Sequence, residues 1–321
     1  MKILILGAGG TGGYFGGRLA QAGADVTFLV RERRAQQLAD HGLRIESPSD
    51  KITLPVKTVL AADVQPIFDV VIIACKAYDL ASSIDAITPA MGENTFVVPL
   101  LNGIAHLDQL DAAFGAHRVL GGSCQIAATL TPDGIVKSMA DTHLILWGTR
   151  EKLREGEPKA QHQRKQQTIA EALGDAFAKT VVTWKVSDNI MLDMWEKVAF
   201  LSTLAGMTCL MRASVGEILA TSDGRAIMAE YMRTSVAIAT AEGYSPRANI
   251  VERFEKILDS TGSTLTASML RDLESGNPVE VDHIVGFMLG KARQHGIDDG
   301  LIRVAHTHLK AYEVRRGKNK G

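Results

Sequence analysis

The sequence predicts an α/β protein in which a doubly wound parallel sheet is followed by an all-α C-terminal domain. In the first half, short apolar runs alternate with helical stretches, and Gly, Asp, Asn or Pro bounds each run. The runs cover residues 3–6, 26–30, 70–74, 96–100 and 143–147. Near-continuous apolar runs are typical of parallel strands that are covered on both faces. The second half contains helical stretches with start and stop signals, which indicates a separate helical domain.

The order of the elements supports this division. The first two apolar runs enclose a helix over residues 12–22, which gives a βαβ unit. Residues 151–168 are rich in charge and glutamine, and they predict an exposed connection that leads into a surface helix. Residues 181–184 predict a last strand before the cap cluster at 187–189.

The helical half has recognisable helix boundaries. Ser214 and Glu217 form a capping-box pattern, and a further helix is expected after Gly300. The other expected helices cover residues 225–242, 264–274 and 280–295. We therefore predict a Rossmann domain over residues 1–186 and a helical substrate and catalytic domain over 187–321, with a ligand-binding cleft between the two halves.

Composition excludes several classes of protein. The 321 residues suffice for about two domains, with 46% apolar and 22% charged residues. The net charge of −1 argues against a general nucleic-acid binder, which needs a strongly basic face. Cys75, Cys124 and Cys209 lie far apart, so we expect neither a disulfide framework nor a thiolate zinc site.

Two apolar segments raise the question of a membrane. Residues 1–6 lead into a glycine string instead of a cleavage site, and the uncharged residues 198–211 fall short of the ~20 needed to span a bilayer. We therefore expect no membrane association and a cytoplasmic location.

A glycine-rich segment lies between the first predicted strand and helix. It consists of Gly7, Ala8, Gly9, Gly10, Thr11 and Gly12. In a βαβ unit, the spacing G-x-G-x-x-G permits a tight turn, close approach of a pyrophosphate, and close packing of helix on strand. The helix N-terminus adds partial positive charge. A glycine turn without a ligand is the simpler alternative, but the position after the first strand favours a dinucleotide site.

The end of the second strand favours NADP(H) over NAD(H). An NAD site usually has Asp or Glu there, which binds the ribose 2′-hydroxyl. Here the strand leads into Arg31, followed by Glu32 and two further arginines. Arginine binds a 2′-phosphate through charge-assisted hydrogen bonds. Glu32 supports the NAD alternative, and a solvated charged loop is the structural alternative.

Polar residues also follow two later strands. Lys76 follows the third apolar run, and Asn102 follows the fourth. Ligands of doubly wound sheets bind beyond the carboxyl ends of the strands, so we expect both residues to reach the nicotinamide half of the cofactor. The alternatives are a surface lysine and a simple Asn-Gly turn.

Three residues of the helical half are candidates for substrate chemistry. Lys197 precedes the uncharged segment, where it is either a surface lysine or a general acid that protonates the oxyanion formed by hydride transfer. Ser268 shares a helix face with Asp272. Glu280 lies in a predicted first helical turn, where a carboxylate also stabilises the helix dipole.

The histidines give no metal-site pattern. His306 and His308 are two residues apart, so their side chains diverge on a helix, and no H-E-x-x-H spacing occurs. We therefore expect no metal. The apolar C-terminal helices allow a homodimer without requiring one.

In order and over nearly the whole chain, these residues resemble the ketopantoate reductase family (2-dehydropantoate 2-reductases). The shared features are the glycine loop, Arg31, Lys76-Ala77, Asn102-Gly103, Trp195-x-Lys197, Ser268-Met269-Leu270-x-Asp272 and Glu280. The resemblance implies a Rossmann domain and a helical domain with NADPH between them. It also implies reduction of a 2-oxo acid to a 2-hydroxy acid, which in the family converts ketopantoate to pantoate in pantothenate biosynthesis.

The resemblance further implies a role for individual residues. Lys197 would be the general acid, with Glu280 orienting it and returning its proton. Ser268 would bind the substrate carboxylate. Asn102 and Lys76 would hold cofactor and substrate. The backbone of Ala128 would contribute a further contact to the cofactor.

Three departures from the family pattern concern the substrate. Members of the family typically have asparagines at the positions of Leu201, Ala205 and Val215. An apolar wall discriminates among substrates far less than one that hydrogen-bonds a hydroxyl. The hydroxyl of Ser202, Thr203 or Thr208 would replace the asparagines in part, although Ser202 and Thr203 lie off the helix face that Lys197 shares with Leu201 and Ala205. The alternatives to a ketopantoate reductase are therefore a paralogous reductase of a more apolar 2-oxo acid and a non-catalytic NADP(H) sensor.

Overall fold

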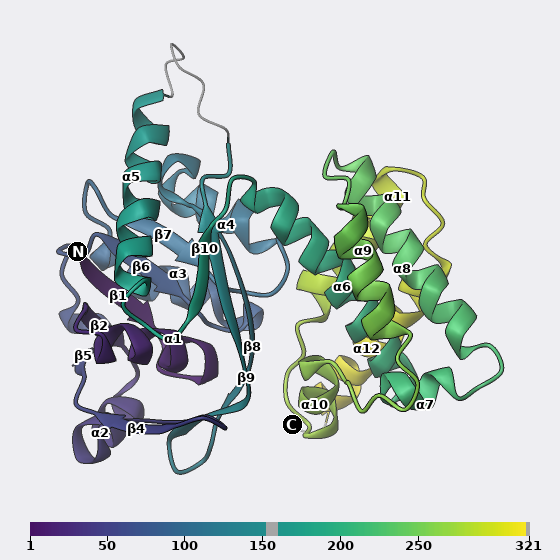
Figure 1. Cartoon of the computed structure of the whole chain (residues 1–321), viewed down its shortest axis with the longest axis horizontal. Coiled ribbons are helices and arrows are strands. Elements are labelled where there is room, and N and C mark those ends of the chain that lie inside the picture. Colours follow the sequence, from purple (N-terminus) through teal and green to yellow (C-terminus); the bar gives the residue numbers. More distant parts are fainter. Residues whose placement is uncertain (152–159, 319–321) are drawn as a thin grey trace. The chain divides into compact units, whose positions relative to one another are not determined.

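A computed structural model of the chain describes residues 1–151 and 160–318. The chain divides into two compact units (Figure 1). The first contains Met1–Leu101 and His106–Ile190, and the second contains Asn102–Ala105 and Met191–Gly321. The exposed connection predicted over residues 151–168 lies partly outside the described residues, and its second part belongs to helix α5.

The first unit is built on a parallel sheet, as the apolar runs predict. Its strand order is β5-β2-β1-β6-β7, and each neighbouring pair is parallel. The strands are β1 (Lys2–Leu6), β2 (Asp25–Leu29), β5 (Lys57–Val59), β6 (Val70–Ile73) and β7 (Phe96–Pro99). The flanking helices are α1 (Gly10–Gln21), α2 (Glu32–His41), α3 (Leu80–Ile87) and α4 (His106–Phe114). This arrangement confirms the predicted fold class.

The strand register determines where a ligand can bind on this sheet. Leu6 at the end of β1 is paired with Leu29 of β2 and with Ile73 of β6. Ile73 is in turn paired with Pro99 of β7. The four strands therefore end in one row, and the loops that follow them start from the same edge.

The first unit contains a second, mixed sheet that the apolar runs do not predict. Its order is β10-β9-β3-β4, with β8 paired to β9. The strands are β3 (Leu43–Glu46), β4 (Lys51–Leu54), β8 (Gly121–Leu130), β9 (Ile135–Gly148) and β10 (Thr183–Val186). The run at residues 143–147 belongs to β9 of this second sheet and not to the parallel sheet of β1; over these residues β9 is parallel to β10 and antiparallel to β8. The strand predicted at 181–184 begins later, because the Thr180 hydroxyl accepts the Val182 N–H in a turn.

The core of the first unit forms around α1, which contacts strands of both sheets. Tyr14, Phe15 and Leu19 of this helix are fully buried. Phe177 of α5 (Ala160–Phe177) packs its ring 5.3 Å from that of Trp147, and both side chains are fully buried. The helix that begins at the glycine loop is thus fixed along its length by apolar packing.

In the residues that the structure describes, the regular elements of the second unit are all helices (teal and green to yellow in Figure 1). The helices are α6 (Ile190–Met211), α7 (Val215–Leu219), α8 (Gly224–Ala241), α9 (Ala248–Leu258), α10 (Ser268–Glu274), α11 (Phe287–Gln294) and α12 (Gly300–Lys318). The predicted capping box is present at α7, where Ser214 and Glu217 bond reciprocally. No helix in the described ranges is both long and apolar enough to cross a bilayer.

Two predicted helices differ from those observed. The first was expected over 264–274 and begins only at Ser268, because the carbonyls of Ser263 and Leu265 accept N–H groups from the start of α7. The second was expected over 280–295. It contains instead a π-helical turn, η5 (Asp282–Gly286), followed by α11. Such turns frequently occur at functional sites.

Candidate active site

The glycine loop connects β1 to α1 at the edge where the parallel strands end. Gly7 has φ +89° and its N–H donates to the Leu29 carbonyl at 2.9 Å. A side chain at Gly12 would collide with the Gly7 carbonyl oxygen. Both positions therefore require glycine for the tight turn and for the close packing of the helix against the loop.

The N-terminus of α1 fits an anionic group. Gly9 is its N-cap, no side chain caps the helix there, and no acidic residue lies in the first turn. A Cβ placed at Gly9 would have no atom within 4 Å, so space is open beside the backbone. Free space, helix N–H groups and the positive end of the helix dipole together suit the pyrophosphate of a dinucleotide.

Two contacts hold this loop in place, and one of them involves Ala128, for which the family resemblance implies a backbone contact to the cofactor. The Ala128 backbone lies against Gly10, because a Cβ at Gly10 would be 2.7 Å from the Ala128 carbonyl oxygen. The Arg34 Nε donates to the Ala8 carbonyl at 3.1 Å, and its Nη1 donates to the Gly134 carbonyl at 3.0 Å. Burial lowers the pKa of Arg34. The sequence showed Arg34 only as one member of a charged cluster.

The predicted phosphate-binding arginine and Lys76 lie near the same edge. Arg31 is the N-cap of α2, its side chain is 86% exposed, and its Nη2 is 3.9 Å from a carboxylate oxygen of Asp79. Asp79 ends the 3-10 turn η2 (Ala77–Asp79), and Lys76 is the N-cap of that turn. The loops after β2 and β6 therefore bring Arg31 and the Lys76 segment together. The exposed guanidinium is accessible to a phosphate.

Asn102 belongs with the second unit, although it follows a strand of the first. The neighbouring Gly103 has φ +90°, and a Cβ there would be 2.5 Å from the His283 carbonyl oxygen. His283 lies in η5, three residues after the buried Glu280. The loop that carries Asn102 therefore packs directly on the segment that follows Glu280.

Lys197 lies on α6, half-buried, in a turn that is packed tightly by its neighbour Trp195. Trp195 is 2% exposed, and its ring centroid is 5.6 Å from that of Phe287 at the start of α11. Because Phe287 directly follows η5, Trp195 joins the Lys197 turn to the segment that begins with Glu280. Ser268 is exposed at the first position of α10.

The structure thus divides the candidate residues between the units. The first unit contains the glycine loop, Arg31, Lys76 and Ala128. The second contains Asn102, Lys197, Ser268 and Glu280. One unit therefore carries the residues suited to a dinucleotide, and the other carries an ammonium, a carboxylate and a hydroxyl.

The hydroxyl groups suggested as replacements for the missing asparagines are directed into the helical core. Ser202, Thr203 and Thr208 have no exposed surface. Thr203 donates to the Ala199 carbonyl at 2.9 Å and Thr208 to the Leu204 carbonyl at 2.6 Å. These hydroxyls are bonded within the bundle, so that suggestion was wrong.

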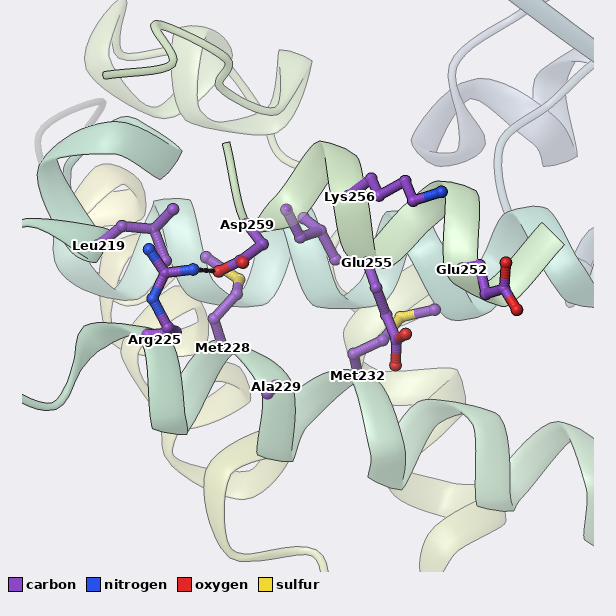
Figure 2. Close-up of a pocket in the computed structure, with 10 residues that line it drawn as sticks. Leu219, Arg225, Met228, Ala229, Met232, Glu252, Glu255, Lys256 and Asp259 are labelled. Carbon is purple, nitrogen blue, oxygen red and sulfur yellow. Dashed lines mark ion pairs between the residues drawn. The ribbon is translucent and has the colours of Figure 1, made fainter. Parts of the chain in front are cut away.

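A separate groove of about 410 Å³ lies between α8 and α9 in the second unit (Figure 2). Its floor includes Met228 and Met232, which are both 2% exposed. An ion pair between Arg225 and Asp259 closes one end, and Glu255 extends toward Met232. None of the candidate residues above lines this groove.

A parallel sheet with a glycine loop at a helix N-terminus is characteristic of dinucleotide-binding oxidoreductases. Residues 3–151 match the family described as Ketopantoate reductase PanE/ApbA, and residues 189–313 match its C-terminal part. The chain belongs to the ketopantoate reductase family of oxidoreductases, whose members use a nicotinamide cofactor and typically depend on NADPH.

Similarity to individual proteins extends over nearly the whole chain. A Bacillus subtilis protein named Uncharacterized oxidoreductase YkpB is 34% identical, with 98% of this chain and 100% of the relative covered. A 2-dehydropantoate 2-reductase of Mesorhizobium japonicum is 28% identical, with 89% of each chain covered. The structure of a D-mandelate dehydrogenase with NADH and anilino(oxo)acetate matches this chain with a TM-score of 0.84 and 23% identity. The match covers 99% of this chain and 100% of that chain, and it establishes similarity of fold.

Proposed function

We propose that this protein reduces a 2-oxo acid to the corresponding 2-hydroxy acid with NADPH. One observation carries the proposal. This chain of the family has a lysine at position 197, and Trp195 packs the turn that bears it against the segment beginning with Glu280. A non-catalytic sensor has no need of such a proton donor. A cytoplasmic location and a homodimer stay predictions.

The proposed chemistry assigns a task to each part of the chain. The glycine loop and the N-terminus of α1 bind the pyrophosphate of NADPH, which supplies a hydride to the ketone carbon when bound. As the carbonyl oxygen gains the electron pair of the C=O bond, Lys197 donates a proton to it. An ammonium at the developing alkoxide stabilises the transition state more than the ground state. Glu280 orients Lys197, and Ser268 binds the substrate carboxylate.

The Arg31→Ala variant tests the assignment of NADPH. We expect its affinity for NADPH to fall about tenfold or more, because a charge-assisted hydrogen bond contributes roughly 1.5–3 kcal/mol. Its affinity for NADH, which has no 2′-phosphate, should stay the same. Fluorescence titration with both cofactors measures the two affinities, and Arg33→Ala, the neighbouring exposed arginine, is the matched control. Equal losses for the two cofactors would contradict the 2′-phosphate role of Arg31.

The identity of the 2-oxo acid has two candidate answers. Ketopantoate is the family substrate, but Leu201, Ala205 and Val215 stand at the positions of its typical asparagines. Ala205 is 3% exposed and Val215 is fully buried, so Leu201, which is partly exposed, is the one of the three whose side chain is accessible to a substrate. These apolar replacements support a 2-oxo acid with an apolar arm as the second candidate. The neighbour of the same fold is named D-mandelate dehydrogenase, and mandelate is the reduced form of a 2-oxo acid with an apolar arm.

A substrate panel distinguishes the two candidates. We expect an acid with an aliphatic or aromatic arm to have a kcat/KM at least about tenfold above that of ketopantoate, because apolar contacts discriminate by roughly 10- to 200-fold per methylene. Consumption of NADPH is followed by absorbance with each acid in turn. A higher kcat/KM for ketopantoate would assign the family reaction to this protein. If no 2-oxo acid is turned over, the result would favour the alternative that the protein is a non-catalytic NADP(H) sensor.

A further inference from the structure

Two arginines of the first unit contact the turn that joins β8 to β9, and Arg34 also contacts the glycine loop. Arg34 of α2 donates from Nε to the Ala8 carbonyl at 3.1 Å and from Nη1 to the Gly134 carbonyl at 3.0 Å. Gly134 has φ +83°, and a Cβ there would lie 2.8 Å from Arg34 Nη1, so the turn is shaped to receive this side chain. Arg44 of β3 donates to the Asp133 carbonyl of the same turn.

The Arg34 guanidinium is enclosed by protein, whereas that of Arg31 is open to solvent. The Nε and Nη1 groups of Arg34 are engaged by two backbone carbonyls, and its Nη2 is shielded from solvent. The Arg31 side chain, three residues earlier, is 86% exposed. The two arginines therefore suit different tasks, because Arg31 can meet a phosphate directly and Arg34 acts on the backbone of the protein.

The hydrogen bond from Arg34 fixes the orientation of one peptide group in the glycine loop. The peptide that links Ala8 to Gly9 is trans, and the C=O and N–H of a planar trans peptide point in opposite directions. While the Ala8 carbonyl faces Arg34, the Gly9 N–H therefore faces away from it. Gly9 is the N-cap of α1 and has open space beside it, so an N–H held in this orientation adds a donor to the anion-binding end of the helix.

The same peptide would turn easily if nothing held it. Turning a peptide plane changes ψ of the residue before it and φ of the residue after it, and a glycine in the second position accepts a wide range of φ. The turned peptide would present the Ala8 carbonyl oxygen to the anion in place of the Gly9 N–H, and the partial negative charge of that oxygen repels an anion. The bond to Arg34 opposes this rearrangement.

We propose that Arg34 is a positioning residue for the cofactor pyrophosphate, because it holds the Ala8–Gly9 peptide with the Gly9 N–H directed to the phosphates. Arg31 then distinguishes NADPH from NADH, and Arg34 contributes affinity that the two cofactors share. This inference rests on the proposed function, in which the glycine loop binds the pyrophosphate.

Three variants separate the effect on the loop from the effect of charge. Arg34→Met removes both hydrogen bonds and one positive charge. Arg34→Lys keeps the charge, but lysine has no planar fork with which to reach the Ala8 and Gly134 carbonyls together, and it carries the test alone if Arg34→Met does not fold. Arg44→Met is the matched control, because it removes an equal charge and a bond to the same turn while the contact between Arg34 and Ala8 stays.

Fluorescence titration measures the affinity of each variant for NADPH and for NADH without any turnover. We expect Arg34→Met to weaken both cofactors by the same factor, about tenfold, which is the scale of one lost hydrogen bond to a charged group. Arg34→Lys should weaken both at least about threefold, because it retains at most one of the two bonds. Arg44→Met should match the wild type.

Steady-state kinetics with the best acid of the panel provide a second readout. In both Arg34 variants we expect KM for NADPH to rise and kcat at saturating NADPH to stay that of the wild type, because the bound cofactor is still held for hydride transfer. Partial unfolding has the opposite signature, since it lowers the concentration of active enzyme and therefore kcat, with KM unchanged. That signature would overturn the positioning role.

Three further outcomes would overturn the inference. A loss confined to NADPH in Arg34→Met would mean that Arg34 binds the 2′-phosphate itself. Wild-type affinity in Arg34→Lys would mean that the positive charge alone is sufficient. An equal loss in Arg44→Met would assign the effect to the turn between β8 and β9. In contrast, a wild type that turns over no 2-oxo acid, but whose variants lose affinity as expected, would overturn the proposed reaction and establish the role of Arg34 in cofactor binding.

Discussion

The Lys197→Ala variant is expected to lose at least about 100-fold in kcat while it still binds NADPH. The expected loss is in line with general acid catalysis, which contributes roughly 10²- to 10⁴-fold. NADPH affinity should persist because the glycine loop and Arg31 belong to the first unit. Steady-state kinetics with the best acid of the panel, together with fluorescence titration of NADPH, measure the two quantities.

Two controls make this result specific. Lys185→Ala removes an exposed lysine of β10 in the first unit, and it should leave kcat unchanged. A primary amine added to Lys197→Ala should restore part of the activity, because it supplies the missing proton donor in solution. Unchanged turnover in Lys197→Ala would mean that another group donates the proton.

The parallel sheet could be predicted because its strands are buried on both faces. All four residues of β6 and of β7 are buried, which gives continuous apolar runs in the sequence. The second sheet gives a much weaker pattern. In β4 exposed and partly buried residues alternate. The C-terminal end of β8 is exposed, so neither strand forms an apolar run.

The candidate site could be predicted where its residues are close in sequence. The glycine loop is a local motif between one strand and one helix, so its spacing alone indicates its place. Arg34 could not be found in this way, because its partner Ala8 lies 26 residues away. The place of Asn102 in the second unit likewise depends on a distant contact, that of Gly103 with His283.

A buried ion pair fixes the helix that the glycine loop begins. Arg18 of α1 is 2% exposed, and it makes two hydrogen bonds of 2.6 Å to the carboxylate of Asp50, in the turn between β3 and β4. The Ser47 hydroxyl also donates to Asp50 at 2.6 Å. The hydrogen bond from Arg18 is the main reason that the pKa of Asp50 is lowered to about 2. This pair joins α1 to the second sheet.

The Asp50→Asn variant is expected to lower the free energy of unfolding by about 3 kcal/mol. The substitution leaves the Arg18 guanidinium buried without its counter-charge, which typically costs roughly 3–5 kcal/mol. Because the Asp50 side chain is about one-third exposed, we expect an effect at the low end of this range. Because the pKa of Asp50 is lower in the folded than in the unfolded protein, its contribution is complete above about pH 4 and is lost as the pH falls toward 2. Urea titrations at neutral and acid pH measure both effects, and the difference between wild type and variant should shrink at acid pH.

Asp25→Asn is the matched control, because it makes the same substitution in an ion pair of similar length at the surface. Asp25 and Lys57 are 2.7 Å apart and are 42% and 70% exposed, so solvent screens their attraction. Such pairs contribute roughly 0–1 kcal/mol. Equal destabilisation by the two substitutions would show that burial of Arg18 adds nothing to the pair. A large loss in Asp50→Asn that persists unchanged at acid pH would attribute the effect to packing of the turn between β3 and β4, and not to the charge of Asp50.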